Sequence, residues 1–241
     1  MIKSLSIIFP VFNEKLRLKS SFNHIISFLK NKKKFKIEII FVDDGSKDDS
    51  FNIINKFITK FRNKKTIFKL VKLKKNLGKG AALKLGVKNA SYDWILTSDI
   101  DMSVSLFQIN SWIKNNQIKK KHLVYFGSRA HVKSKVKKKI IRNILGNIMR
   151  FLISVILDIK IKDTQCGYKL YKKDIAKLIF SKLKSYGFDY DLELVLFLKS
   201  KKIKITELPV KWVHKDNSSL NIFWDPLKMF FGIFKIKLRF L

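Results

Sequence analysis

The first hundred residues contain a series of short apolar segments, each of which stops abruptly at polar or acidic residues. The apolar segments are residues 5–9, 36–42 and 94–97. The polar groups that follow them are Asn13-Glu14, Asp43-Asp44 and Asp99-Ile100-Asp101. A run of four to eight apolar residues that ends at a turn signal is typical of a strand buried in a sheet. The sequence therefore predicts buried strands with acidic groups at their carboxyl ends.

Helix-like stretches separate these strands. Apolar residues recur at helical spacing in residues 16–30 and 51–61, and a short helix is predicted at residues 81–89. A further strand is expected at residues 67–73. Alternation of strands and helices predicts an α/β fold with a mostly parallel sheet and helices on both faces. Ligands of such sheets bind beyond the carboxyl ends of the strands, which is where the acidic groups fall.

The second half of the chain has a less regular and more basic pattern. Strands are expected at residues 123–126 and 203–213, and a helix at residues 189–199. Residues 140–157 are typical of an amphipathic helix with an apolar end. Because no linker interrupts this pattern, we predict one α/β domain over residues 1–215.

Residues 216–241 are expected to form a C-terminal amphipathic appendage. Its aromatic and aliphatic residues recur at broadly helical spacing and are interleaved with lysine and arginine. A basic amphipathic helix of this kind suits the headgroup region of a membrane. The alternative is that the helix packs on the preceding domain, and the two interpretations are compatible.

The composition excludes several classes of protein. The chain has 241 residues, of which 52 are Lys or Arg and 18 are Asp or Glu, giving a formal net charge of +34. The hydrophobic fraction of 46% excludes intrinsic disorder, and a single cysteine, Cys166, excludes an internal disulfide framework. No apolar run is long enough for a signal peptide or a conventional membrane span. The charge draws the chain to anionic partners but does not choose among them.

The pair Asp99 and Asp101 is a candidate metal site. Two carboxylates separated by one residue after a strand converge on one hard divalent cation, and Ser103 follows as a further oxygen donor. Such oxygen ligands suit Mg²⁺ or Mn²⁺, which would neutralise a nucleotide diphosphate. The alternative is an ordinary acidic loop, and a second acidic strand end at Asp43-Asp44 counts against it.

Two neighbouring segments suit a nucleotide. The carboxylates of Asp43 and Asp44 can accept hydrogen bonds from ribose hydroxyls or a base N–H. Lys79, between two glycines at a predicted helix start, suits a phosphate. The spacings of a phosphate-binding P-loop and of a nicotinamide-binding G-x-G-x-x-G are both absent from the sequence. Each segment also has a simpler interpretation as a turn or helix cap.

Taken in order, these motifs resemble a known family. PVFNE (10–14), VDDGS (42–46), NLGKGAAL (76–83) and SDIDMS (98–103) resemble the family 2 glycosyltransferases of the GT-A, Rossmann-like fold. GSRAH (127–131), DTQCGYKLY (163–171) and FDYDLEL (188–194) are similar to dolichyl-phosphate β-glucosyltransferases, relatives of the dolichyl-phosphate mannose synthases. The resemblance extends over residues 4–241.

The resemblance implies roles for particular residues. The strand-end motifs add Asn13, Asp44, Lys79 and Asp99 to the four residues, Pro10, Val11, Glu14 and Asp43, that the resemblance places in the nucleotide pocket. The resemblance makes Asp99 and Asp101 the metal pair, with Asp101 the more direct ligand. Two positions depart from the family pattern: Phe12 stands where tyrosine is frequent, and Ser103 stands where the mannose synthases often have glutamine.

The resemblance also implies an acceptor site. Arg129 and Arg142 correspond to residues that bind the lipid phosphate, and Asp191 to a carboxylate close to the reaction centre. Arginine suits this task because its planar fork binds phosphate through two hydrogen bonds. A phosphate monoester is already an anion, so it can attack the anomeric carbon without a strong general base, and the enzyme mainly aligns the reactants. Asp101, Asp191, Arg129 and Arg142 are therefore the expected catalytic residues.

We therefore expect an inverting, metal-dependent transfer of glucose from UDP-glucose to a polyprenyl phosphate, giving a β-linked product. The enzyme would work peripherally on the cytoplasmic face of a membrane. The first alternative is mannose transfer from GDP-mannose with the same fold and mechanism. The alternative from another class is a basic nucleic-acid-binding protein. That alternative leaves the acidic strand ends without a purpose, so we expect no nucleic-acid partner.

Overall fold

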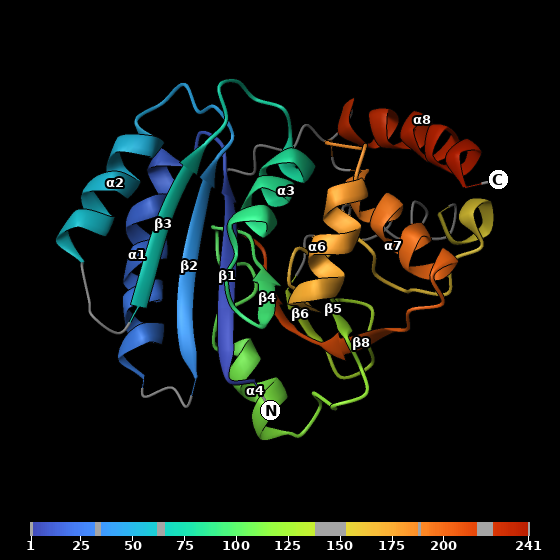
Figure 1. The fold of residues 1–241 in the computed structure, drawn as a ribbon, viewed down its shortest axis with the longest axis horizontal. Helices are drawn as coiled ribbons and strands as arrows, with labels where there is room; N and C mark the ends of the chain where they lie inside the picture. The colour runs from blue at the N-terminus through green and yellow to red at the C-terminus, as the bar shows by residue number, and fades with distance from the viewer. Residues whose placement is uncertain are drawn as a thin grey trace.

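The computed structural model describes residues 2–31, 35–61, 66–137, 153–187, 189–215 and 224–240. Within these residues, seven strands form one sheet in the order β3-β2-β1-β4-β7-β5-β8 (Figure 1). Its strands are β1 (Ser4–Val11), β2 (Lys36–Asp43), β3 (Thr66–Lys72), β4 (Trp94–Thr97), β5 (Val124–Ser128), β7 (Lys169–Lys172) and β8 (Ile205–Pro209). A second, two-stranded sheet pairs β6 (Lys135–Lys137) with β9 (Lys211–Val213).

The order of the strands creates the ligand-binding edge. β1 is parallel to β2 on one side and to β4 on the other, so the chain changes direction across the sheet between β1 and β4. Such a switch point leaves a crevice beyond the carboxyl ends of the strands. β7 runs antiparallel to β4, with Lys169 paired to Thr97. The first residue of β7 therefore lies at the same edge as the last residue of β4.

Helices cover both faces of the sheet, as the sequence predicts. They are α1 (Lys15–Lys30), α2 (Ser50–Lys60), α3 (Lys79–Asn89), α4 (Gln108–Lys114), α6 (Lys173–Lys182), α7 (Tyr190–Ser200) and α8 (Trp224–Arg239), and residues 153–157 are also helical.

Alternate residues of the strands supply the two apolar cores. Ile39 and Phe41 of β2 pack in the core under α1 and α2, whereas Ile40 and Val42 pack in the core under α3, α6 and α7. This period of two is expected for a strand buried on both faces. It explains why KIEIIFV is apolar almost throughout.

Four elements of the second half differ from the sequence prediction. The single strand expected at residues 203–213 is two strands, because Val210 leaves the main sheet after Pro209 and the chain then pairs with β6. β6, which lies in a segment expected to be a basic loop, was not predicted, and neither were β7 and α6. Much of the helix predicted at residues 140–157 lies outside the described residues.

The described end of α8 packs on α7. Ile233 and Ile236 are fully buried, and the Arg239 guanidinium lies 3.3 Å from the Glu193 carboxylate (Figure 1). Residues 216–223, where the appendage is predicted to begin, lie outside the described residues. Every helix in the described part of the chain is too short or too polar to be a membrane span.

Candidate active site

Asp99, after β4, lies at the centre of the sheet edge. Its Oδ1 accepts a hydrogen bond of 2.5 Å from the Lys79 ammonium group at the start of α3. The carboxylate also lies against the backbone of Gly167, where a Cβ atom would be 2.4 Å from Oδ2. Burial would raise the pKa of Asp99, but the charges of Lys79, Lys169 and Arg129 outweigh it and lower the pKa. Asp99 is therefore an ionised carboxylate surrounded by cations.

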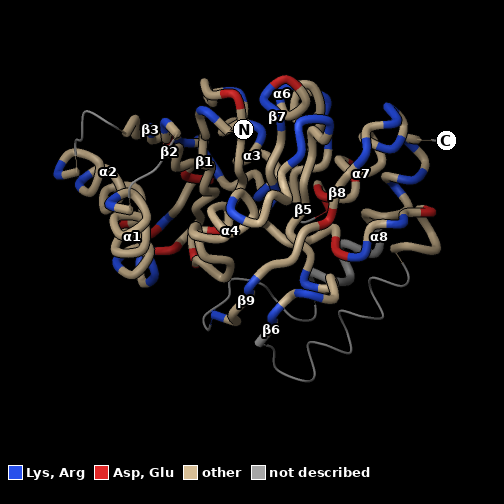
Figure 2. Tube along the Cα trace, turned by 90° about the horizontal axis from the view of Figure 1, so that it is seen from below, with Lys and Arg blue, Asp and Glu red and all other residues tan. Residues whose placement is uncertain are grey.

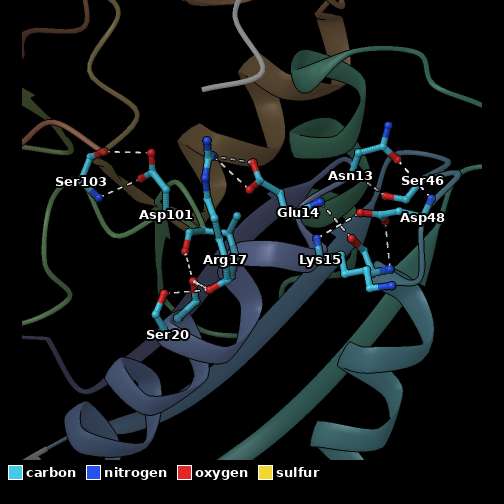
Figure 3. Close-up of polar contacts among 12 residues, drawn as sticks. Asn13, Glu14, Lys15, Arg17, Ser20, Ser46, Asp48, Asp101 and Ser103 are labelled. Carbon is cyan, nitrogen blue, oxygen red and sulfur yellow. Dashed lines mark hydrogen bonds and ion pairs between the residues drawn. The ribbon is translucent and has the colours of Figure 1, made fainter. Parts of the chain in front are cut away.

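Asp101 lies two residues after Asp99, in the same turn that follows β4. Its two carboxylate oxygens accept hydrogen bonds from the Ser103 backbone N–H and hydroxyl, each of 2.8 Å (Figure 3). Burial raises the pKa of Asp101, and the negative charge of Asp99 raises it further. The two carboxylates therefore repel each other, which is the electrostatic condition that a bound cation relieves.

Glu14, after β1, faces this pair. Arg17, one turn into α1, extends between Glu14 and Asp101 and donates to both Glu14 oxygens at 3.1 and 3.0 Å (Figure 3). The pKa of Glu14 is raised to about 7, because burial, assisted by the charges of Asp101 and Asp99, outweighs the lowering by Arg17. The Arg17 guanidinium thus lies between two carboxylates at this edge of the sheet, pairing with Glu14 and acting electrostatically on Asp101.

This donor set fits Mg²⁺ or Mn²⁺. The described residues contain no group of three or more side chains arranged as a complete metal site. Mg²⁺ is commonly held by only one or two carboxylates, with substrate phosphates and water completing its shell. Asp99 and Asp101, which the sequence analysis proposed as ligands, are the carboxylates that could hold such an ion here.

The end of β2 provides a buried acceptor. Asp43 is fully buried; its Oδ2 accepts from the Ser46 N–H at 3.3 Å, while its Oδ1 has no partner among the described residues. A buried acceptor without a partner is costly, so a ligand N–H or O–H at this point would be favourable. The adjacent predicted residues Pro10 and Val11 pair with Val42 and Asp43 in the sheet.

The other predicted nucleotide residues at this end shape the backbone. Asp44 accepts from the N–H groups of Leu77 and Gly78, each at 2.8 Å, and so holds the loop that leads to Lys79. Gly78 has φ +106°, and a Cβ atom there would be 2.3 Å from the Tyr186 carbonyl oxygen. Asn13 accepts from the Lys47 N–H at 2.8 Å and thus joins the turn after β1 to the turn after β2 (Figure 3).

Arg129, after β5, forms a bidentate pair with Asp163. Its Nε and Nη2 donate to the two Asp163 oxygens at 2.7 and 2.8 Å, and its backbone N–H donates to Asp163 as well. Nη1 is the guanidinium nitrogen that Asp163 does not engage. Burial would lower the pKa of Arg129, but Asp163 raises it, so the group is cationic. Arg142, the second predicted acceptor residue, lies outside the described residues.

Asp191, near the start of α7, is buried beside Lys169. The Lys169 ammonium group, which is fully buried, donates to Asp191 Oδ1. Burial raises the pKa of Asp191 and lowers that of Lys169, so the pair is drawn toward its neutral form while each partner opposes the shift. Asp191 also raises the pKa of Lys79, which connects this pair to Asp99 electrostatically.

Three charged residues of the site were missed by the sequence analysis. Arg17, Lys169 and Asp163 each pair with a predicted residue. Asp163 and Lys169 both lie in the segment DTQCGYKLY, which the resemblance had singled out. Arg17 has one available signal, because arginine is rare in this lysine-rich chain and Arg17 follows Glu14 at the helical spacing of three residues.

A family model described as "Glycosyl transferase family 2" matches residues 6–180. This chain is a family 2 glycosyltransferase. The glycosyltransferase is 31% identical to the human protein named dolichyl-phosphate beta-glucosyltransferase, over 99% of this chain and 76% of that protein. It is 34% identical to the protein of the same name from Dictyostelium discoideum, over 98% of this chain and 75% of that protein. The resemblance drawn from the motifs is thereby confirmed.

Solved structures confirm the GT-A fold. Glucosyl-3-phosphoglycerate synthase from Mycobacterium tuberculosis, crystallised with Mn²⁺, UDP-glucose and phosphoglyceric acid, superposes with a TM-score of 0.69. The alignment covers 98% of the glycosyltransferase and 80% of that chain at 12% identity. At this identity the likeness concerns the fold alone.

Proposed function

We propose that this glycosyltransferase moves glucose from UDP-glucose to a polyprenyl phosphate of the dolichyl type and forms a β-linked product. The observation that carries the proposal is the similarity, over 98–99% of the chain, to relatives named dolichyl-phosphate beta-glucosyltransferase. The site adds chemical support, because an anionic acceptor and a diphosphate leaving group both require cations near the reacting atoms.

The proposed reaction is a single displacement. An oxygen of the acceptor phosphate attacks the anomeric carbon of glucose, the bond from that carbon to the diphosphate oxygen breaks, and UDP leaves with the bonding pair. Attack opposite the leaving group inverts an α-linked donor to a β-linked product. The phosphate needs no general base, so the protein mainly aligns the reactants and balances charge.

The residues at the strand ends divide this work. Asp43 would accept a hydrogen bond from the base, and Lys79 would lie beside the diphosphate. Asp191, whose Oδ1 is held by Lys169, would orient the sugar or the acceptor near the reaction centre. Asp99 and Asp101 would hold Mg²⁺ or Mn²⁺, which supplies positive charge to the departing diphosphate.

Arg129 and Arg142 are the proposed acceptor-phosphate residues. Arg129 would use Nη1 for this contact, because Asp163 engages its Nε and Nη2. The same pairing supports the proposal physically, since it fixes the plane of the guanidinium before the acceptor arrives. We place the enzyme on the cytoplasmic face of a membrane as a peripheral protein, with residues 1–215 as the catalytic domain and residues 216–241 as the appendage.

GDP-mannose remains the alternative donor. An unpartnered carboxylate oxygen such as Asp43 Oδ1 accepts equally well from the ring N–H of uracil or of guanine, so this contact does not select the base. The choice of glucose as the sugar follows the relatives, whose names specify a glucosyltransferase, and UDP as its carrier is part of the proposal.

The test is transfer of labelled sugar into solvent-extractable polyprenyl phosphate. UDP-glucose, UDP-galactose, UDP-N-acetylglucosamine and GDP-mannose are compared, each with Mg²⁺, with Mn²⁺ and with a chelator. We expect metal-dependent transfer from UDP-glucose. Transfer from GDP-mannose alone would keep the reaction type and overturn the donor, and no transfer from any donor by the folded protein would overturn the proposed function.

A further inference from the structure

The two-stranded β6–β9 sheet presents like charges side by side. In its parallel register Lys135 lies directly opposite Lys211, and both side chains are exposed. Directly opposed like charges destabilise a strand pair. No carboxylate in the described part of the chain forms an ion pair with either lysine. Among the described residues, this sheet therefore has lysine charges without an ion-pair partner, which an anionic partner would neutralise.

The surroundings extend this basic surface. Lys133, just before β6, and Lys215, just after β9, are also exposed. Neither segment 129–137 nor segment 210–215 contains an acidic residue. In Figure 2 the lysine-bearing strands β6 and β9 lie below the described main sheet, away from α2. We call Lys133, Lys135, Lys211 and Lys215 the lysine strip.

Exposed apolar side chains accompany the lysine strip. Val132 is 87% exposed and Val213 is 44% exposed. Small aliphatic groups among lysines match an interface that is anionic at its surface and apolar just beneath it. A nucleic acid offers phosphates but no apolar layer for these valines, so the combination favours a lipid surface.

The strip is hydrogen-bonded to the main sheet and to the turn of the candidate active site. The Ser134 hydroxyl donates to the Ser128 carbonyl oxygen at 2.6 Å and accepts from the Val210 N–H at 2.9 Å, which anchors both strands to the main sheet. The Val213 N–H donates to the carbonyl oxygen of Ser103 at 2.9 Å. Ser103 is the residue that binds both Asp101 oxygens. One residue therefore connects the strip to the turn of the proposed metal pair.

We infer that the lysine strip, with Val132 and Val213, is a docking surface for an anionic lipid bilayer. It would bring the edge of the sheet that carries Arg129 close to lipid headgroups; the Arg129 guanidinium lies 5.9 Å from the centre of the Trp212 ring in β9. The inference rests on the proposed function only in choosing lipid over other polyanions. It assigns the membrane contact to a surface separate from α8.

Vesicle binding of the full chain tests the inference. Partition onto phosphatidylcholine vesicles with about 30% phosphatidylserine is measured by flotation near physiological salt, without donor or metal. We expect the variant Lys135→Gln/Lys211→Gln to bind about 30-fold more weakly than the unaltered protein, since each lysine near an anionic surface contributes about a fivefold factor. The control Lys56→Gln/Lys60→Gln removes the same charge from the exposed side of α2 and should change binding less than about twofold.

A label provides a second measurement that does not depend on charge. Cys166 is buried, so Val132→Cys provides an accessible thiol for an environment-sensitive fluorophore. Its emission should shift to the blue on vesicles, while the same label introduced by Lys56→Cys should not shift. Two results would overturn the inference. One is an equal loss of vesicle binding in the Lys135/Lys211 and Lys56/Lys60 variants, and the other is no emission shift of the label at position 132.

Two further measurements test whether the membrane contact lies on α8 and whether the partner is a nucleic acid. Loss of binding in Phe234→Ser/Leu238→Ser, with no loss in the lysine-strip variant, would assign the membrane contact to α8 and overturn the inference. If the variant Lys135→Gln/Lys211→Gln lost binding to a single-stranded RNA but still bound vesicles, the partner of this surface would be a nucleic acid and the inference would be overturned. If the protein transfers sugar but does not bind vesicles, the proposed function is supported and only this inference is overturned.

Discussion

Lys79 and Asp99 form an ion pair of 2.5 Å that joins the first residue of α3 to the turn after β4. The two residues come from different motifs, NLGKGAAL after β3 and SDIDMS after β4. In the sheet, β2 and β1 lie between these two strands. The pair places a cation beside the proposed diphosphate position without any ligand. The site therefore carries its own compensating charge before a nucleotide arrives.

Lys79→Met should lower kcat/KM for UDP-glucose by about 100-fold, because a preorganised charge beside the leaving group is removed. Initial rates of sugar transfer at varied donor concentration measure this. Lys88→Met, on the exposed side of the same helix, is the matched control and should be near wild type. Equal rates for the two variants would contradict the assigned role of Lys79.

Asp101→Asn should remove the metal dependence of nucleotide binding. The change keeps the size of the side chain but removes the charge that a divalent cation requires. Calorimetric titration with UDP should show that Mn²⁺ strengthens binding to the wild type and has little effect on the variant. Asp93→Asn, an exposed position before β4, controls for net charge. Persistence of the Mn²⁺ effect in Asp101→Asn would refute the metal assignment.

Arg129→Lys should weaken use of the acceptor and leave UDP binding nearly unchanged. Lysine cannot reproduce the bidentate contact with Asp163, so the cation at this point would lose its fixed orientation. We expect the acceptor KM to rise by about tenfold or more, since charged hydrogen bonds contribute about 1.5–3 kcal/mol. A parallel loss of UDP affinity would place Arg129 at the donor instead.

Lys169→Met should destabilise the fold by about 3 kcal/mol, because it leaves the buried Asp191 without its partner. Lys169→Met/Asp191→Leu should recover much of this stability, since apolar residues can replace a buried pair. Urea unfolding measures both variants. The double variant should lack transfer activity even though its stability is recovered. Recovery of activity along with stability would mean that Asp191 has only a structural role.

Glu14→Gln should change how stability depends on pH. The pKa of Glu14 is raised to about 7, from an ordinary value near 4.5. Between these values the folded state binds more protons than the unfolded state, so the free energy of unfolding falls as pH rises through this window. The variant lacks this titration and should lose less stability between pH 5 and pH 8. Urea unfolding at each pH measures the free energy of unfolding of the two proteins. If that free energy changed equally with pH in both, Glu14 would have no such shift.

The main sheet and its ligand edge could be predicted from local sequence. The apolar runs at β1, β2 and β4 are long and end at clear turn signals, so both the strands and the acidic groups after them were identifiable. β7 gave no such signal: its four residues, KLYK, include two lysines, and Lys169 is buried only because Asp191 arrives from α7. The bend at Val210 likewise depends on a partner, since β9 exists only where β6 lies beside it.

The sequence by itself determined the α/β alternation, the family and the residues at the strand ends, because these follow from local periodicity and short motifs. The tertiary structure alone decided how those residues are paired. Arg17 with Glu14 and Ser103 with Asp101 are local pairs, whereas Lys79 meets Asp99 and Arg129 meets Asp163 across 20 and 34 residues of chain. The position of a charge along the chain does not fix its partner, because only folding brings distant strand ends to one edge and buries their side chains enough to shift their pKa values.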